Sequence, residues 1–143
     1  MNLCFPPFEY RVRVHDGQRQ IFDILRKKYV CLTPEEWVRQ HVIHFLINEK
    51  GYSPSLMAVE RAFTLNGLVR RFDLVCFDRS GDIFMVVECK NSSVKLSNEV
   101  FDQVFCYNTE LRAPYVAVTN GLEVIAGRFG ERGAEIMDTF PEF

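Results

Sequence analysis

Three charged side chains interrupt a part of the sequence that otherwise has the pattern of two β-strands. Asp73 belongs to a mainly apolar run over Phe72–Phe77, and Glu88 and Lys90 stand at the end of a second run over Ile83–Cys89. Strand interiors disfavour such residues, and acids and lysines are seldom buried without a partner. These three residues are therefore the first candidates for a chemical site.

The turn between the two runs aligns the two acids. Asp78-Arg79-Ser80-Gly81 is a turn sequence, so the pattern predicts an antiparallel hairpin. If the loop is Ser80-Gly81, or a symmetric four-residue loop around it, Asp73 lies directly opposite Glu88, with Cβ atoms about 4.5–5.5 Å apart. Like charges at that separation destabilise a sheet, and a divalent cation such as Mg²⁺, which prefers carboxylate oxygens, would offset the repulsion. Lys90 projects from the same face as Glu88 because side chains alternate along a strand.

The arrangement Asp-x14-Glu-x-Lys resembles the PD-(D/E)xK phosphodiesterase superfamily, and more specifically the N-terminal nuclease domain of type I restriction enzyme R subunits. The resemblance extends from about Leu32 through Gly121, in the segments LTPEEWVRQ, RRFDLVCFD, VVECKN, FDQVFCYN and VAVTNG. Phe72 precedes Asp73 where the motif name has proline, a departure that leaves the carboxylate in place. The resemblance implies an α/β (α+β) fold: a restriction-endonuclease-like three-layer core with a mixed central sheet flanked by helices.

The same resemblance implies a Mg²⁺-dependent endonuclease, with Mn²⁺ as a substitute, that hydrolyses phosphodiester bonds in DNA. Asp73 and Glu88 would hold the metal, helped by the backbone carbonyl of Cys89, so that a bound water becomes acidic enough to attack. Lys90 would position that water or stabilise charge developing on the phosphate. Partner subunits of a restriction system are expected as well.

A second helix, predicted from about Ser97 to Arg112, carries Gln103 and Tyr107 one turn apart beside its apolar stripe. This Gln-x-x-x-Tyr pair resembles a motif that follows Glu-x-Lys in the RecB-like branch of the superfamily, where it lies by the active site and the substrate. Gln103 would then orient Lys90 or the phosphate. Both residues could instead be ordinary boundary residues of the helix.

The first helix begins at Thr33-Pro34, where Thr33 is a good N-cap, Pro34 suits the first helical position and Glu36 completes a capping box. The helix is expected to end at Gly51. In the resembled superfamily an acidic residue of this helix often joins the metal site, and Glu36 is the matching candidate. A pure capping role and a metal-proximal role for Glu36 are both open.

The remaining elements follow from alternation and turn residues. Residues 1–32 are expected to form a peripheral hairpin, turning at Asp16-Gly17. A helix between Cys89 and Tyr115 fits a crossover to a parallel strand. The further strands are predicted at Met57–Leu65, Pro114–Thr119 and Leu122–Arg128.

Composition is that of a globular protein, with 48% apolar and 25% charged residues in 143, so we expect a single domain over 1–143. No apolar run approaches the ~18 residues of a membrane span, and the N-terminus lacks a secretory pattern, so a cytoplasmic protein is expected. Five cysteines without a C-x-x-C pair indicate reduced thiols rather than a disulfide framework or a zinc ribbon.

The formal net charge of −2 counts against tight independent binding to DNA, which usually requires a basic surface. A cleft with local lysines, arginines and a metal ion remains compatible with it. The alternative function is a DNA-binding or assembly module that keeps the nuclease fold without cleaving. A structural network, in which Lys90 neutralises Glu88 and no metal binds, is a further alternative.

Overall fold

The computed structural model describes residues 3–131 and 133–143. Their helices and strands, in chain order, are β1 (Val12–His15), β2 (Gln18–Asp23), β3 (Lys28–Cys31), α1 (Pro34–Lys50), η1 (Pro54–Leu56), β4 (Met57–Leu65), β5 (Leu68–Phe77), β6 (Ile83–Cys89), α2 (Asn98–Leu111), β7 (Tyr115–Thr119), β8 (Val124–Gly130) and β9 (Gly133–Met137).

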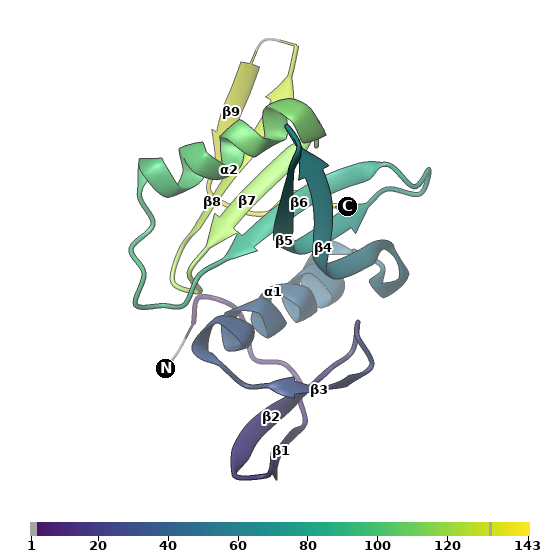
Figure 1. Cartoon of the computed structure of the whole chain (residues 1–143), viewed down its shortest axis with the longest axis vertical. Helices are drawn as coiled ribbons and strands as arrows, with labels where there is room; N and C mark the ends of the chain where they lie inside the picture. Colours follow the sequence, from purple (N-terminus) through teal and green to yellow (C-terminus); the bar gives the residue numbers. More distant parts are fainter. Residues whose placement is uncertain (1–2, 132) are drawn as a thin grey trace.

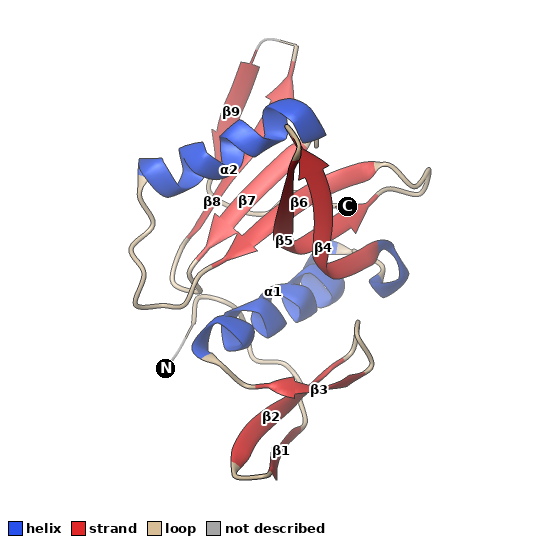
Figure 2. Cartoon of the chain, in the orientation of Figure 1, coloured by secondary structure: helices blue, strands red, loops and turns tan. Residues whose placement is uncertain are grey.

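A six-stranded mixed sheet of order β4-β5-β6-β7-β8-β9 forms the centre of the structure. All neighbouring strands are antiparallel except β6 and β7, which α2 connects by a crossover. The two helices cover opposite faces of this sheet (Figures 1 and 2), and each face has its own apolar cluster. The expected three-layer arrangement, a mixed sheet flanked by helices, is confirmed.

The N-terminal residues form a separate antiparallel sheet of order β1-β2-β3, next to α1 (Figure 1). The predicted hairpin turns at Asp16 and Gly17, which have φ angles of 49° and 76°. A third strand, β3, was not predicted. It follows a turn in which Asp23 Oδ1 accepts hydrogen bonds from the backbone N–H groups of Leu25 and Arg26, at 2.7 and 3.0 Å.

The start of α1 explains how Glu36 becomes available for other contacts. Thr33 Oγ1 accepts a hydrogen bond from the Glu36 N–H at 3.0 Å, as an N-cap does, and Gly51 ends the helix at a φ of 79°. The second half of the predicted capping box is absent, because the Thr33 N–H donates to the carbonyl of Cys31 at 3.1 Å. The Glu36 carboxylate binds arginines instead.

The β5–β6 register is the predicted one, although the loop is not. Leu74 pairs with Val87 and Val75 with Val86, so that Asp73 and Glu88 occupy the next positions. The connection is a five-residue loop closed by a hydrogen bond from the Asp78 N–H to the Asp82 carbonyl at 2.8 Å, and the register shifts between Cys76 and Phe77. The shift accommodates the longer loop, so the pairing of Leu74 with Val87 keeps the predicted register.

The end of α2 is attached to the connection before β7 through a buried asparagine. Asn108 donates from Nδ2 to the carbonyl of Ala113 at 2.9 Å, and its Oδ1 accepts from the Ala113 N–H at 2.8 Å. We expect Asn108→Ala to lower the free energy of unfolding by about 1–3 kcal/mol, because it leaves buried backbone groups unpaired. Denaturant unfolding measures this, and Thr109→Ala, at an exposed neighbouring position, should change it by less than about 0.5 kcal/mol. Equal losses would contradict the anchoring role.

No helix of the described residues is long and apolar enough to cross a membrane.

Candidate functional site

Two carboxylates continue the β5–β6 pairing where the backbone ladder stops. Glu88 Oε1 accepts a hydrogen bond from the backbone N–H of Asp73 at 3.1 Å, and Asp73 Oδ2 accepts one from the N–H of Cys89 at 2.8 Å. Side-chain oxygens therefore take the place of the carbonyls that a continued ladder would use. The structure brings Asp73 and Glu88 together, at the position where the register predicts them.

The alternation of side chains along β5 breaks at Asp73. Phe72 packs in the apolar cluster beneath α2 and Leu74 in the cluster beneath α1, although residues two apart on a regular strand share a face. Opposite them in β4, Glu60 has a φ of 55°, and the pairing runs from Val59 directly to Arg61. This irregularity lets Asp73 reach α1.

The contact of Asp73 on α1 is Arg39, with Arg39 Nη2 2.7 Å from Asp73 Oδ1. Arg39 is buried, and its Nη1 also lies 3.1 Å from Glu36 Oε1. Sequence reasoning missed Arg39. The available signal was the position of this arginine in the predicted helix, where Val38 and Val42 are apolar neighbours.

Glu36 lies in an ion-pair network rather than directly on Asp73. Its carboxylate accepts hydrogen bonds from Arg26 Nη2 at 2.6 Å, from Arg39 Nη1 at 3.1 Å and from Gln40 Nε2 at 3.2 Å. The carboxylate of α1 that interacts with Asp73 is Glu35. Burial, and after it the negative charge of the neighbouring Asp73 carboxylate, raises the pKa of Glu35.

The electrostatics of Glu88 show that negative charge is crowded here. Burial, and after it the charge of Asp73, raises the pKa of Glu88 to about 8, although the Asp73 N–H and the Lys90 ammonium act in the opposite direction. Burial also raises the pKa of the Cys89 thiol, so that this side chain stays neutral in the core. Only its backbone carbonyl remains a candidate ligand.

A cavity of about 280 Å³ lies between the sheet and α2, beside Glu88. Glu88, Lys90, Gln103 and Tyr107 all line it, so the structure gathers these four predicted residues around one space. Gln103 Nε2 donates to Tyr107 Oη at 3.5 Å. Arg70 lies over the Tyr107 ring at 5.0 Å.

Lys90 is half-buried at the edge of this cavity. Among residues 3–131 and 133–143, no carboxylate oxygen lies within 4.0 Å of its ammonium. Its charge nevertheless opposes the rise in the pKa values of Glu35 and Glu88, as a cation a little farther away does. Lys90 is therefore near the acids without being bound to either.

The donor set fits a hard divalent cation in chemistry, because Glu35, Asp73 and Glu88 are carboxylates whose mutual repulsion such an ion would relieve. In the described part of the chain, no three His, Cys, Asp or Glu side chains already converge as ligands. Arg39 supplies positive charge at Asp73 Oδ1 instead. The site has the ligand types for Mg²⁺, with one oxygen engaged by an arginine.

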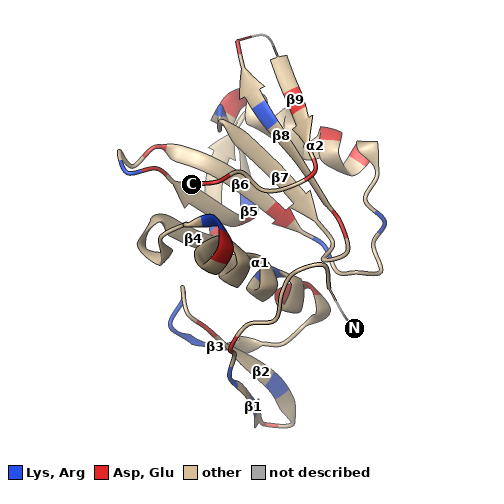
Figure 3. Cartoon of the chain, turned by 180° about the vertical axis from the view of Figure 1, so that it is seen from behind, with Lys and Arg blue, Asp and Glu red and all other residues tan. Residues whose placement is uncertain are grey.

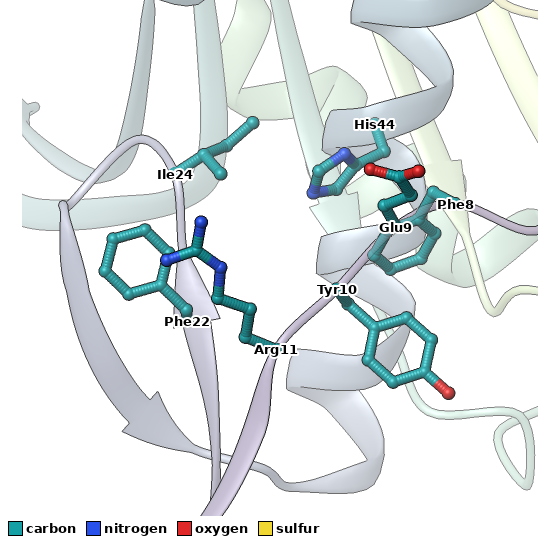
Figure 4. Close-up of a pocket in the computed structure, with 7 residues that line it drawn as sticks. All are labelled: Phe8, Glu9, Tyr10, Arg11, Phe22, Ile24 and His44. Carbon is teal, nitrogen blue, oxygen red and sulfur yellow. The ribbon is translucent and has the colours of Figure 1, made fainter.

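A larger cavity, of about 620 Å³, contains none of these residues (Figure 4). It lies between the N-terminal segment 8–11, β2 and α1. Arg11 lies beside the Phe22 ring, and His44 lines the cavity from α1. His44 stacks on Phe8 with ring centroids 4.2 Å apart, and burial lowers its pKa. This histidine is a neutral packing residue, and the candidate chemistry remains at the smaller cavity.

Comparison with known proteins identifies a family and a solved structure of similar fold. The family described as type I restriction enzyme R protein N terminus (HSDR_N) matches residues 34–141. A solved fragment, described as an HsdR subunit of a type I restriction enzyme from Vibrio vulnificus YJ016, has a TM-score of 0.58 and 18% sequence identity. That match covers 78% of this chain and 24% of the other, so the chain spans about a quarter of the solved one. No curated protein matches the sequence.

The matched region, 34–141, begins with the first residue of α1 and includes both helices, the whole six-stranded sheet and every predicted site residue. The structural likeness supports the fold of this region independently of the sequence match. The chain therefore belongs to the family of type I restriction enzyme R protein N termini.

Proposed function

We propose that this chain is a Mg²⁺-dependent DNA endonuclease domain that hydrolyses phosphodiester bonds. The observation that carries the proposal is the pair Asp73 and Glu88, in which burial and the neighbouring negative charge raise the pKa of Glu88 to about 8. Like charges placed next to each other on paired strands cost stability, and an ion bound between them would remove that cost. Family membership supports the restriction-enzyme context.

Each residue has a task that its position permits. Asp73, Glu88 and the Cys89 carbonyl would hold the metal, with a carboxylate of α1 nearby, either Glu35 or the originally predicted Glu36. When bound, Mg²⁺ would supply Lewis-acid activation of the phosphodiester and of the attacking water.

On the cavity side, the Lys90 ammonium is available to orient that water or to stabilise charge on the phosphate. Gln103 and Tyr107 line the same cavity and would contact the substrate backbone.

The surface agrees with a domain that needs help to hold DNA. The formal net charge is −2, and Figure 3 shows acidic and basic positions interspersed along the ribbon. Phosphate contacts supply much of the affinity of DNA-binding proteins. Partner subunits of a restriction system would therefore deliver the DNA to this domain.

The metal site is tested by thermal unfolding with and without millimolar Mn²⁺. An ion that binds the folded state raises the melting temperature. We expect the wild-type melting temperature to rise and that of Asp73→Asn to stay unchanged. Glu135→Gln, on the exposed strand β9, removes a carboxylate elsewhere and should respond as the wild type does. An identical response of wild type and Asp73→Asn would refute a metal site at Asp73.

A DNA-binding or assembly module that does not cleave is the second candidate. The observation that favours it is the ion pair of 2.7 Å between Arg39 and Asp73, which neutralises one acid without any metal. A plasmid-nicking assay with Mg²⁺ separates the two functions, because only the nuclease converts supercoiled plasmid to the open circle.

A further inference from the structure

Arg39 is the arginine of α1 that reaches the carboxylate pair. Its Nη2 lies 2.7 Å from Asp73 Oδ1, and the side chains of Arg39 and Asp73 are only 7% and 12% exposed. Water and salt screen such a pair poorly. The guanidinium therefore engages an oxygen that the proposed metal would need, and repels a cation approaching it.

The same guanidinium has other acceptors close by. Nη1 lies 3.1 Å from Glu36 Oε1 and 3.8 Å from Glu60 Oε1. Nε is buried without a hydrogen-bond partner among the described residues. A small movement away from Asp73 would leave the arginine paired, and would allow Nε to find an acceptor.

Glu60 is suited to receive the arginine. It is 49% exposed, so its carboxylate can move, and its φ of 55° is a conformation that non-glycine residues adopt only where the surroundings enforce it. This backbone geometry occurs directly opposite Asp73 in the β4–β5 pair. The irregularity that turns Asp73 toward α1 thus also places an alternative acceptor beside Arg39.

We propose that Arg39 competes with the divalent cation for Asp73. In the metal-free protein the guanidinium neutralises Asp73, and when the ion binds, it withdraws to Glu36 and Glu60. Resting on the proposed metal site, this assigns to Arg39 the role of setting its affinity. The domain would consequently bind metal weakly by itself, and substrate phosphate would favour loading by adding ligands on the other side.

Arg26 provides a matched control. Like Arg39 it binds Glu36 Oε1, at 2.6 Å, and lies 3.7 Å from Glu60 Oε2. Its other carboxylate partner is Asp23, at 2.7 Å, and not Asp73. Arg26→Gln therefore removes the same formal charge from the same network without freeing an oxygen of Asp73.

The experiment titrates Mn²⁺ into each protein without DNA and follows the free ion by electron paramagnetic resonance. We expect Arg39→Gln to bind Mn²⁺ about tenfold more tightly than wild type, since a nearby positive charge and a competing ligand are both removed. Arg26→Gln should gain less than about twofold, because its charge lies farther from Asp73. Circular dichroism and melting establish that each variant is folded.

Arg39→Lys covers the case in which Arg39→Gln fails to fold. Lysine keeps the charge but cannot hold Asp73 and Glu36 at once with a planar fork, so Mn²⁺ should bind about threefold more tightly than in wild type. Unchanged Mn²⁺ binding in a folded Arg39 variant would overturn the proposal, because Arg39 would then not compete for Asp73. Weaker binding would also overturn it, because Arg39 would then be holding Asp73 in place. Equal gains in the Arg26 and Arg39 variants would also overturn it.

Rejection of the metal site can be distinguished from rejection of the competition. If no protein of the series binds Mn²⁺, both the proposed metal site and the competition are wrong. If wild type binds Mn²⁺ and Asp73→Asn does not, while the Arg39 variants match wild type, the site stands and only the competition is rejected.

Discussion

Replacing Lys90 by alanine is expected to abolish DNA nicking while the fold and the metal affinity persist. Within the described residues, no carboxylate lies at ion-pair distance from the Lys90 ammonium, so its loss breaks no direct salt bridge. Lys90 faces the cavity shared with Gln103 and Tyr107, where a phosphate would sit. Removing a group that stabilises charge only in the transition state typically costs about 10²–10³-fold in rate.

Plasmid nicking, melting and Mn²⁺ binding are measured side by side. Lys90→Arg should not restore nicking, because a wide planar guanidinium does not replace a compact ammonium. Lys95→Ala, at an exposed position in the loop before α2, is the control and should nick as wild type does. Persistent nicking in Lys90→Ala would exclude Lys90 from the mechanism, and an unfolded variant without metal affinity would favour a structural network.

Glu88→Gln is expected to stabilise the metal-free protein at pH 8. Burial and the charge of Asp73 raise the pKa of Glu88 to about 8 from an ordinary 4.5, so the folded state holds a proton that the unfolded state releases. Each pKa unit corresponds to about 1.4 kcal/mol. Between pH 4.5 and pH 8, Glu88 thus lowers the free energy of unfolding by on the order of a few kcal/mol, and the partial exposure of its side chain reduces this loss.

The sign follows from the protons bound. Above pH 4.5 the unfolded state binds fewer protons than the folded state, so the contribution of Glu88 to stability is complete below pH 4.5 and is lost as the pH rises to about 8. Glutamine carries no charge at any of these pH values. The two proteins should therefore have similar stability near pH 4.5 and diverge toward pH 8.

Denaturant unfolding at pH 5, 6.5 and 8 measures this divergence. Glu135→Gln, an exposed carboxylate on β9, should follow the wild type at each pH. Mn²⁺ should restore the stability of the wild type at pH 8, because a metal binds the ionised acid. It should leave the stability of Glu88→Gln unchanged. Parallel pH curves for wild type and Glu88→Gln would show that Glu88 is not the group that titrates.

Several features of this protein were determined by the sequence itself, because they depend on local patterns. Strand alternation with the Asp16-Gly17 turn placed the N-terminal hairpin, and Thr33 and Gly51 bounded α1. These signals act between neighbours, so their effect is readable without the rest of the fold. The opposition of Asp73 and Glu88 followed from the same local register, even though the loop is longer than predicted.

Position along a helix was readable for α2 but not for α1. The spacing of Gln103 and Tyr107 puts them on one side of α2, and the structure places both at the cavity with Lys90. For the adjacent Glu35 and Glu36, the family resemblance indicated Glu36 as the metal-proximal acid, with a capping role as the alternative, and the structure places Glu35 beside Asp73. Which of two consecutive residues faces the sheet depends on how the helix is rotated about its axis, and packing against the sheet sets that rotation.

The charge arrangement at Asp73 was decided by tertiary structure alone. Arg39 is 34 residues away from Asp73 in sequence, and their contact requires α1 to pack against the sheet beside the middle of β5. It also requires the irregularity at Glu60, which breaks the alternation that every strand prediction assumes. Sequence patterns therefore determined which residues are acidic and roughly where they stand, whereas long-range packing decided which cation neutralises them.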